Sequence, residues 1–305
     1  MSKLLEGKVI IVTGAGNGVG KGIALEAARQ GAKVLVNDLG VAIDGSGASA
    51  GPAETVVNEI KGFGGEAAAN TDSVAEFASA EKMVQQCLDT WGRIDGVVNN
   101  AGNMRDIIFH KMTEADFDSV IKVHLKGSWN TSRAAAPHLK AQNSGAFVHM
   151  TSSAGLIGNF GQVNYIAAKM GIVGMSKAIS LDMEKFNVRS NCIAPFAFTR
   201  LVDSIPRDTP DGEERYRVNS RMEVNKIAPF TCALLTDGAK DVSGQIFGVR
   251  ANEIYLFSQP RPIRSVHAGD AGWTVETCLE RAIPAMRGSF YPLDKSRDVF
   301  TWDPV

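Results

Sequence analysis

The stretch Val9-Ile10-Ile11-Val12-Thr13-Gly14-Ala15-Gly16-Asn17-Gly18-Val19-Gly20 runs from a short apolar segment through a glycine-rich turn into a helical pattern over residues 18–30. Gly14 permits the tight turn, Gly18 lets the backbone approach a pyrophosphate, and Gly20 lets the helix pack close to the sheet. The helix N-terminus then offers free N–H groups and a partial positive charge to an anion. The spacing is GxxxGxG, and an acid ends the next apolar run about twenty residues later, which predicts a dinucleotide-binding strand–turn–helix unit.

Apolar runs and helical patterns alternate along most of the chain. Further strands are expected at 33–37, 66–70, 96–99, 146–150, 188–192 and 244–249, and further helices at 52–62, 75–91, 113–141 and 162–186. The strands are continuous apolar runs, which is typical of a parallel sheet covered on both faces. Because strands and helices alternate, right-handed crossovers are implied, and the expected fold class is α/β, a Rossmann-type doubly wound parallel sheet.

The chain is expected to form one domain followed by a tail. The domain covers residues 1–257, and its charged, proline-interrupted segment at about 199–226 lies where such folds carry a lid over the substrate. Residues 258–305 follow the last expected strand and contain several prolines. Because this segment is too short for a core of its own, we expect an extended C-terminal extension with one short helix near 274–287.

The composition is that of a near-neutral soluble protein. Of the 305 residues, 44% are hydrophobic and 21% are charged, and the formal net charge is −1. This balance argues against a nucleic-acid or anionic-membrane partner. No apolar run reaches the roughly 18 residues that cross a bilayer, and the polar N-terminus does not read as a signal peptide. The four widely spaced cysteines are expected to be reduced, so a cytoplasmic location is predicted.

Asp38 ends the second expected strand. A carboxylate at this position accepts hydrogen bonds from both ribose hydroxyls of a dinucleotide and repels a 2′-phosphate. The next residue is Leu39, not the arginine or lysine that a 2′-phosphate favours. The sequence therefore predicts NAD, rather than NADP, as the cofactor. The histidines show no metal-ligand spacing, so no metal site is expected.

Further cofactor candidates follow the third and fourth strands, at the carboxyl edge where such sheets bind ligands. The two segments are Asp72-Ser73-Val74 and Asn99-Asn100-Ala101-Gly102, and each is also compatible with an ordinary turn. The full predicted set for the dinucleotide is Gly14, Asn17, Gly18, Val19, Gly20, Asp38, Asp72, Ser73, Val74, Asn100, Ala101, Gly102, Tyr165, Lys169, Pro195 and Thr199.

Ser152, Tyr165 and Lys169 form a candidate proton-transfer set. The tyrosine and the lysine are four residues apart and share one face of a helix, where the ammonium can lower the pKa of the phenol. Ser152 stands at the end of an apolar run and can reach the same point from a strand terminus. A hydroxyl, a phenol and an ammonium at one point can move a proton on and off an alcohol oxygen.

With these motifs in this order, the chain resembles the short-chain dehydrogenase/reductase family over about residues 5–250. It is similar to the hydroxyacyl-CoA branch, the (3R)-hydroxyacyl-CoA dehydrogenase domain of the peroxisomal multifunctional enzyme and its free-standing bacterial relatives, in segments that include 36–40, 123–128 and 158–162. The resemblance implies that Tyr165 is the general base, that Ser152 orients the reacting oxygen, and that Lys169 lowers the pKa of the tyrosine and holds the nicotinamide ribose.

Two positions depart from the pattern of the wider family. His124 stands where most members carry an asparagine that relays protons through water, and the imidazole can either relay a proton or only fill the space and hold the helix. Phe196 follows Pro195 where many relatives have glycine, and we expect it to narrow the nicotinamide pocket.

The expected function is NAD-dependent hydride transfer between a secondary alcohol or ketone and the nicotinamide. The resemblance favours a 3-hydroxyacyl-CoA thioester as the substrate, with a hydroxysteroid or another bulky secondary alcohol as the rival. A non-catalytic dinucleotide-binding regulator is the alternative from another class, and the intact Ser152, Tyr165 and Lys169 count against it.

A homodimer or homotetramer is implied by the resemblance, with the helices at 113–141 and 162–186 at the main interface. The tail at 258–305 is expected to contribute to assembly or to cover a neighbour's pocket. Phe290, Tyr291, Phe300 and Trp302 are its aromatic residues, and packing on the chain's own core is the alternative for them.

Overall fold

The computed structural model describes residues 3–40, 51–197, 209, 213–214, 216–217 and 220–305. The predicted lid at 199–226 therefore lies in large part outside the described residues, and Thr199 lies wholly outside them. No helix in the described ranges is both long and apolar enough to cross a membrane.

Eight strands form one sheet in the order β3-β2-β1-β4-β5-β6-β7-β8. Every neighbouring pair from β3 to β7 is parallel, which confirms the doubly wound α/β fold. The strands are β1 Val9–Thr13, β2 Lys33–Asn37, β3 Glu66–Asn70, β4 Gly96–Asn99, β5 Gly145–Met150, β6 Val188–Phe196, β7 Ile246–Arg250 and β8 Glu253–Leu256.

The last strand, β8, was not expected. It pairs antiparallel with β7 through a tight turn in which Ala251 adopts a left-handed φ of 51°. The side chains of Glu253–Leu256 alternate between half-buried and exposed, as on an edge strand, so this segment has no continuous apolar run that would have marked it in the sequence.

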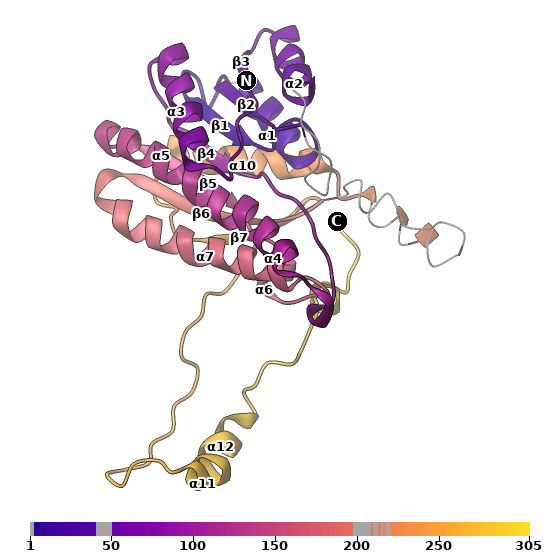
Figure 1. The fold of residues 1–305 in the computed structure, drawn as a ribbon, viewed down its shortest axis with the longest axis vertical. Coiled ribbons are helices and arrows are strands. Elements are labelled where there is room, and N and C mark those ends of the chain that lie inside the picture. The colour runs from indigo at the N-terminus through magenta and orange to yellow at the C-terminus, as the bar shows by residue number, and fades with distance from the viewer. Residues whose placement is uncertain (1–2, 41–50, 198–208, 210–212, 215, 218–219) are drawn as a thin grey trace.

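Helices cover both faces of the sheet (Figure 1). One apolar core lies under α1 Gly18–Arg29, α2 Gly51–Gly62 and α10 Ala228–Leu235. The other lies under α3 Phe77–Trp91, α5 Gly127–Gln142 and α7 Val163–Met183. The fully buried strands β1 and β4 separate the two cores, which explains why these runs are apolar at every position.

The helix expected at 113–141 consists of three parts. Thr113 caps α4 Glu114–Ile121 in a capping box with Asp116. A π-helical turn, η2 Lys122–Lys126, then carries His124, and α5 follows without a break. Single π-helical turns are frequent at functional sites, and apolar periodicity does not predict them.

Shorter helical segments connect these elements. They are η1 Phe109–Lys111, α6 Ser153–Leu156, η3 Glu184–Phe186, η4 Val224–Ile227, η5 Asp237–Ala239, α11 Val275–Thr277, η6 Cys278–Ala282, α12 Ile283–Arg287 and α13 Ser296–Val299.

The tail leaves the sheet and comes back to it. Figure 1 shows α11 and α12 standing away from the sheet at the end of two extended segments, near the predicted helix position. The returning end packs on the chain itself: the Phe300 ring lies 4.7 Å from that of Phe196 and 5.4 Å from that of Tyr255. The Trp302 indole N–H donates to Glu253 at 2.8 Å. Phe300 and Trp302 therefore pack on the chain itself, at the end of β6 and on the edge strand β8.

Candidate active site

The glycine turn after β1 is held in a conformation that other residues would disturb. Gly14 has a φ of 62°, and a Cβ there would lie 2.8 Å from the Cα of Ala101. A Cβ on Gly20 would lie 2.2 Å from the carbonyl oxygen of Gly14. Both glycines are therefore required by close backbone approach, as the sequence predicts.

Among the described residues, none crowds the turn at Gly18. Gly18 has a φ of 55°, and a Cβ there would meet nothing within 4 Å. Asn17 precedes α1 without a side-chain hydrogen bond to the helix, and the first turn of α1 contains no acidic residue. The first N–H groups of a helix have no partner within the helix, and glycine leaves the backbone accessible. Both features suit an anionic group such as a pyrophosphate.

Asn100 locks this turn to the end of β4. Its side-chain amide donates to the carbonyl oxygens of Thr13 and Gly14, each at 3.0 Å. In return, the Thr13 hydroxyl accepts the backbone N–H groups of Asn100 and Ala101 at 3.0 and 3.1 Å. The structure thus brings these two predicted segments together, and it gives the Asn100 side chain a supporting position under the turn.

Asp38 lies beside the same turn. Its carboxylate accepts the backbone N–H of Gly16 and that of Gly40, each at 2.8 Å. A Cβ on Gly16 would lie 2.8 Å from this carboxylate, so only glycine lets the turn come so close. The carboxylate is fixed and half-buried, and a carboxylate has further lone pairs that can accept ribose hydroxyls.

The segment after β3 is also fixed from inside. The Asp72 carboxylate accepts the Asn70 side-chain amide at 2.8 Å, and Asn37 donates to the Asp72 carbonyl oxygen at 2.9 Å. Asn130 on α5 donates to the carbonyl oxygen of Val74 at 2.7 Å. The Asp72 carboxylate is thus hydrogen-bonded within the protein. Half-buried Ser73 lies between Asp72 and Val74, which are both held by hydrogen bonds, at the carboxyl edge of the sheet.

Ser152, Tyr165 and Lys169 converge, as expected. Ser152 follows β5 and caps α6, and it lies close enough to Tyr165 for its hydroxyl to hydrogen-bond to the phenol. The Lys169 ammonium lies 5.4 Å from the centre of the Tyr165 ring. It is buried and donates to the carbonyl oxygen of Met150 at 2.6 Å.

Burial shifts the pKa values of both Tyr165 and Lys169. Burial raises the pKa of Tyr165, the hydrogen bond from Ser152 lowers it, and the charge of Asp106 raises it further. Burial also lowers the pKa of Lys169 to about 7, so its ammonium is only partly charged at neutral pH. Burial disfavours the charged forms of both groups, and the lowering of the tyrosine pKa by Lys169 stays a prediction for the protein with bound dinucleotide.

His124 packs edge-on against Tyr165, with the ring centres 5.3 Å apart. Its Nε2 atom lies 3.1 Å from the backbone N and 2.8 Å from the backbone O of Asn103. Its Nδ1 atom is buried and has no hydrogen-bond partner in the described part of the chain. Burial, aided by Lys169, lowers the pKa of His124 to about 3, so the ring is neutral at physiological pH. These contacts favour a role in holding the tyrosine ring over a relay through imidazolium.

Gly102 and Pro195 complete the described part of the predicted set. A Cβ on Gly102 would lie 2.3 Å from the His124 ring, so this glycine makes room for the histidine. Pro195 lies near the end of β6, opposite Val249 in the register. Phe196, the next residue, faces the aromatic cluster of Tyr255 and Phe300.

Sequence reasoning missed a loop that borders the tyrosine. Gln162 donates to the carboxylate of Asp106 at 2.7 Å, and Asn164 donates to the carbonyl oxygen of Arg105 at 3.0 Å. Asp106 follows the end of β4 by only a few residues, at the carboxyl edge of the sheet. That position was the available signal, but no spacing in the sequence connects it to Tyr165.

The site fits a nicotinamide dinucleotide. The open backbone at Gly18 and the helix N-terminus suit its pyrophosphate, and Asp38 suits an adenosine ribose. No group of histidine, cysteine, aspartate or glutamate among the described residues could hold a metal ion.

Comparison with known proteins agrees with this geometry. The family model for short chain dehydrogenases matches residues 8–208. The chain belongs to the short-chain dehydrogenase family. It is therefore an oxidoreductase that binds a nicotinamide dinucleotide.

Three relatives show the range of the likeness. The chain is 43% identical over 258 residues to the peroxisomal hydratase-dehydrogenase-epimerase of Saccharomyces cerevisiae, covering 85% of this chain and 27% of that protein. The chain thus spans about a quarter of the length of that relative. The solved structure of a short chain dehydrogenase from Mycobacterium avium is 35% identical, with a TM-score of 0.81 over 95% of this chain and 97% of that one. A 7α-hydroxysteroid dehydrogenase, solved with NADH and 7-oxo glycochenodeoxycholic acid, is 28% identical, with a TM-score of 0.72 over 82% and 96%.

Proposed function

We propose that the protein is an NAD-dependent dehydrogenase whose substrate is a 3-hydroxyacyl-CoA thioester. The observation that carries the chemistry is the convergence of Ser152 and Lys169 on Tyr165. The substrate class rests on the 43% identity to the peroxisomal hydratase-dehydrogenase-epimerase.

Each residue of the set has a distinct part in the proposed reaction. The bound dinucleotide supplies the hydride acceptor. Tyr165 takes the proton from the alcohol, Ser152 holds the reacting oxygen by a hydrogen bond, and Lys169 supplies a proton-exchanging amine next to the phenol. His124, neutral and packed on the phenol ring, keeps that ring in place.

NAD is proposed over NADP because of Asp38. Its carboxylate is fixed by two backbone N–H groups, so it cannot easily turn away from an added 2′-phosphate. A negative phosphate at this point would be repelled by the carboxylate.

A bulky hydroxysteroid is the second candidate substrate. The likeness to a 7α-hydroxysteroid dehydrogenase, at a TM-score of 0.72, favours it. The identity to that protein is 28%, against 43% for the multifunctional relative, so the thioester remains the first choice.

The test is a comparison of substrates with a matched catalytic variant. A 3-hydroxyacyl-CoA and a free hydroxysteroid are each offered with NAD and with NADP, and reduced cofactor is followed by absorbance. We expect turnover of the thioester with NAD. Tyr165→Phe should lower kcat by about a thousandfold and leave NADH binding nearly unchanged, because the hydroxyl contacts the reactant and not the dinucleotide cradle.

Three results would contradict parts of the proposal. Absence of thioester turnover together with steroid turnover would replace the substrate. Normal activity of Tyr165→Phe would remove the mechanism. Tight NADH binding without turnover of any alcohol would favour the non-catalytic regulator.

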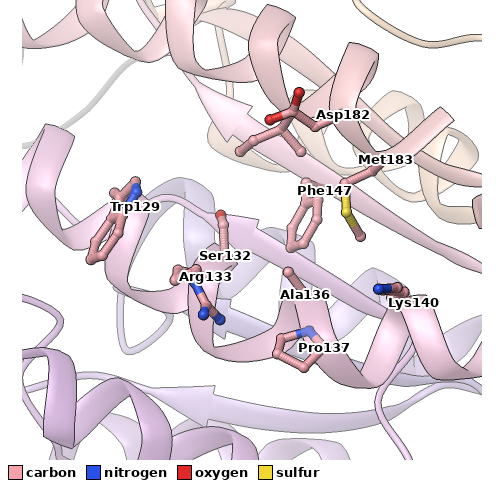
Figure 2. Close-up of a pocket in the computed structure, with 10 residues that line it drawn as sticks. Trp129, Ser132, Arg133, Ala136, Pro137, Lys140, Phe147, Asp182 and Met183 are labelled. Carbon is pink, nitrogen blue, oxygen red and sulfur yellow. The ribbon is translucent and has the colours of Figure 1, made fainter.

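We propose that the protein assembles as a homodimer or homotetramer through α5 and α7. A hollow of about 440 Å³ lies between these helices and is lined by residues that include Trp129, Ala136, Pro137, Phe147 and Met183. Figure 2 shows these side chains. None of the predicted site residues lines this mainly apolar hollow, so it is not the substrate cleft. A second copy of the chain would cover it. A cytoplasmic location also stays a proposal.

A further inference from the structure

Asp106 carries a negative charge next to the reacting centre that the proposed mechanism does not use. It lies on the loop after β4, its side chain is exposed, and its charge acts on the Tyr165 phenol. In the described part of the chain it forms no ion pair. Arg105, its neighbour in sequence, acts instead on Asp116.

A chain of amides fixes the direction of this carboxylate. The Asn159 amide donates to the Gln162 side-chain oxygen at 3.0 Å, which leaves the Gln162 N–H₂ group to donate to Asp106 at 2.7 Å. Because the acceptor of Gln162 is already occupied by Asn159, the orientation of the Gln162 amide is defined.

The backbone around Asp106 is equally fixed. The Ile107 N–H donates to the Gly161 carbonyl oxygen at 2.9 Å, and Asn164 donates to the Arg105 carbonyl oxygen at 3.0 Å. Asn164 also accepts the Tyr165 backbone N–H at 2.8 Å, so one residue links the loop to the start of the catalytic helix. The carboxylate therefore keeps its distance to the phenol.

The other titratable groups around Tyr165 do not cancel the negative charge of Asp106. His124 from η2 is neutral, because burial lowers its pKa to about 3. Lys169 from α7 is buried, its pKa is about 7, and its ammonium donates inward to Met150. The fixed charge of Asp106 thus acts on the phenol, whereas the partly charged Lys169 amine donates to the carbonyl oxygen of Met150.

We propose that Asp106 is a specificity-determining residue, whose fixed carboxylate selects neutral acyl derivatives such as thioesters and rejects free 3-hydroxy acids. A free 3-hydroxy acid holds its carboxylate two carbons from the reacting hydroxyl, whereas a thioester has a neutral carbonyl at that place. The like charge of Asp106 repels the acid and has little effect on the thioester. This inference deepens the proposed function and rests on it for the natural substrate.

The experiment compares two small substrates with the same acyl chain. The N-acetylcysteamine thioester of 3-hydroxybutyrate is neutral, and free 3-hydroxybutyrate is anionic. Asp106→Asn keeps the shape and can still accept from Gln162, and we expect it to raise kcat/KM for the free acid by about tenfold with a change of less than about twofold for the thioester. The discrimination of the wild type should weaken at high salt, because ions screen an exposed charge.

Asp118→Asn is the matched control. Asp118 is an exposed aspartate on α4 outside the site, and the substitution removes the same charge. Asp106→Ser is a second variant that removes the charge with a different side chain. Equal discrimination by the wild type and both Asp106 variants would overturn the inference.

A second readout does not depend on activity. The chain has four tyrosines, and the titration of Tyr165 is isolated from ultraviolet spectra by subtracting those of Tyr165→Phe. Asp106→Asn should lower the pKa of Tyr165, and Asp118→Asn should leave it in place. If the wild type turns over no thioester, the proposed function fails, and the titration still decides whether Asp106 acts on the phenol; an unchanged titration overturns the inference.

Discussion

His149 lies in the middle of the sheet with no exposed surface. Its Nδ1 accepts the Asn99 side-chain amide at 3.0 Å, which leaves Nε2–H to donate to the Ser190 hydroxyl at 3.1 Å. His149 is therefore a core residue with both ring nitrogens hydrogen-bonded. Burial, aided by the charge of Lys169, lowers the pKa of His149 to about 3. At the scale of the residue, burial thus decides which histidines, lysines and tyrosines carry charge, and it does so for His124 and Lys169 as well.

The buried histidines predict loss of stability in mild acid. The unfolded chain protonates a histidine near pH 6.5, whereas folded His149 stays neutral to about pH 3. Between these values the unfolded state binds more protons, so the free energy of unfolding falls as the pH falls, by about 1.4 kcal/mol per pH unit for each such histidine.

His149→Asn should reduce the pH dependence of the free energy of unfolding by about 1.4 kcal/mol per pH unit, the contribution of one proton. The measurement is urea unfolding between about pH 5 and 6.5. The asparagine can keep one of the two hydrogen bonds, so the fold should survive. The same substitution at the exposed His110 controls for the change of residue type. An unchanged slope in His149→Asn would show that this histidine is already charged in the folded protein.

At the scale of the element, the strand–turn–helix unit and the end of β4 form one body. Thr13, Gly14 and Asn100 exchange hydrogen bonds across the two segments, and the missing Cβ atoms at Gly14 and Gly20 permit the contact. The cradle for the dinucleotide is therefore rigid before any ligand binds. The same principle holds at Gly102, where an absent Cβ admits the His124 ring.

Gly14→Ala should damage this cradle. The residue has a φ of 62°, and its new Cβ would lie 2.8 Å from the Cα of Ala101, so the turn must move. We expect a loss of about 1–3 kcal/mol in the free energy of unfolding and at least a tenfold weaker binding of NADH, measured by quenching of protein fluorescence. Gly62→Ala at the end of α2 is the control, because a Cβ there meets nothing within 4 Å. Unimpaired NADH binding by Gly14→Ala would show that the dinucleotide does not use this turn.

At the scale of the whole molecule, the tail has two parts with different surroundings. The end of the tail packs on the segment between α6 and α7. The Ser296 N–H donates to the Gly158 carbonyl oxygen at 3.0 Å, and Lys295 lies over the Phe160 ring. The middle of the tail, with α11 and α12, stands away from the sheet in Figure 1. Val275, Leu279 and Ile283 are 74%, 62% and 36% exposed and lie four residues apart on one helical stripe. A stripe of this kind is typical of a contact with another protein surface.

We predict that this stripe takes part in assembly. Val275→Asp together with Leu279→Asp should lower the mass of the particle in light scattering, because two charges cannot be buried against an apolar partner. The fold of the single chain should be unaffected, since both side chains are exposed. Lys111→Asp, at the exposed end of η1, is the control, because this single substitution also makes the net charge two units more negative. Wild-type mass and wild-type kinetics in the double variant would exclude both predicted roles of this part of the tail.

Local patterns were sufficient to predict much of this protein. The glycine turn, the acid after β2 and the four-residue spacing of Tyr165 and Lys169 are short-range features, and each depends on steric or periodic rules that act within one element. The parallel strands were also predictable, because burial on both faces requires apolar residues at every position. The edge strand β8 and the π-helical turn at His124 were not, since neither has a distinctive periodicity.

The sequence by itself determined the fold class and pointed to Ser152, Tyr165 and Lys169 as the candidate proton-transfer set. Only the tertiary structure decided their charges and their neighbours. The pKa values of Tyr165 and Lys169 depend on how much water the folded chain removes. Asp106 is held near the start of α7 by a hydrogen bond from Gln162, which is 56 residues away in sequence. The tertiary structure also decided the path of the tail. Nothing in the sequence distinguishes its aromatic residues, but Phe300 packs against the end of β6 whereas Tyr291 is 84% exposed.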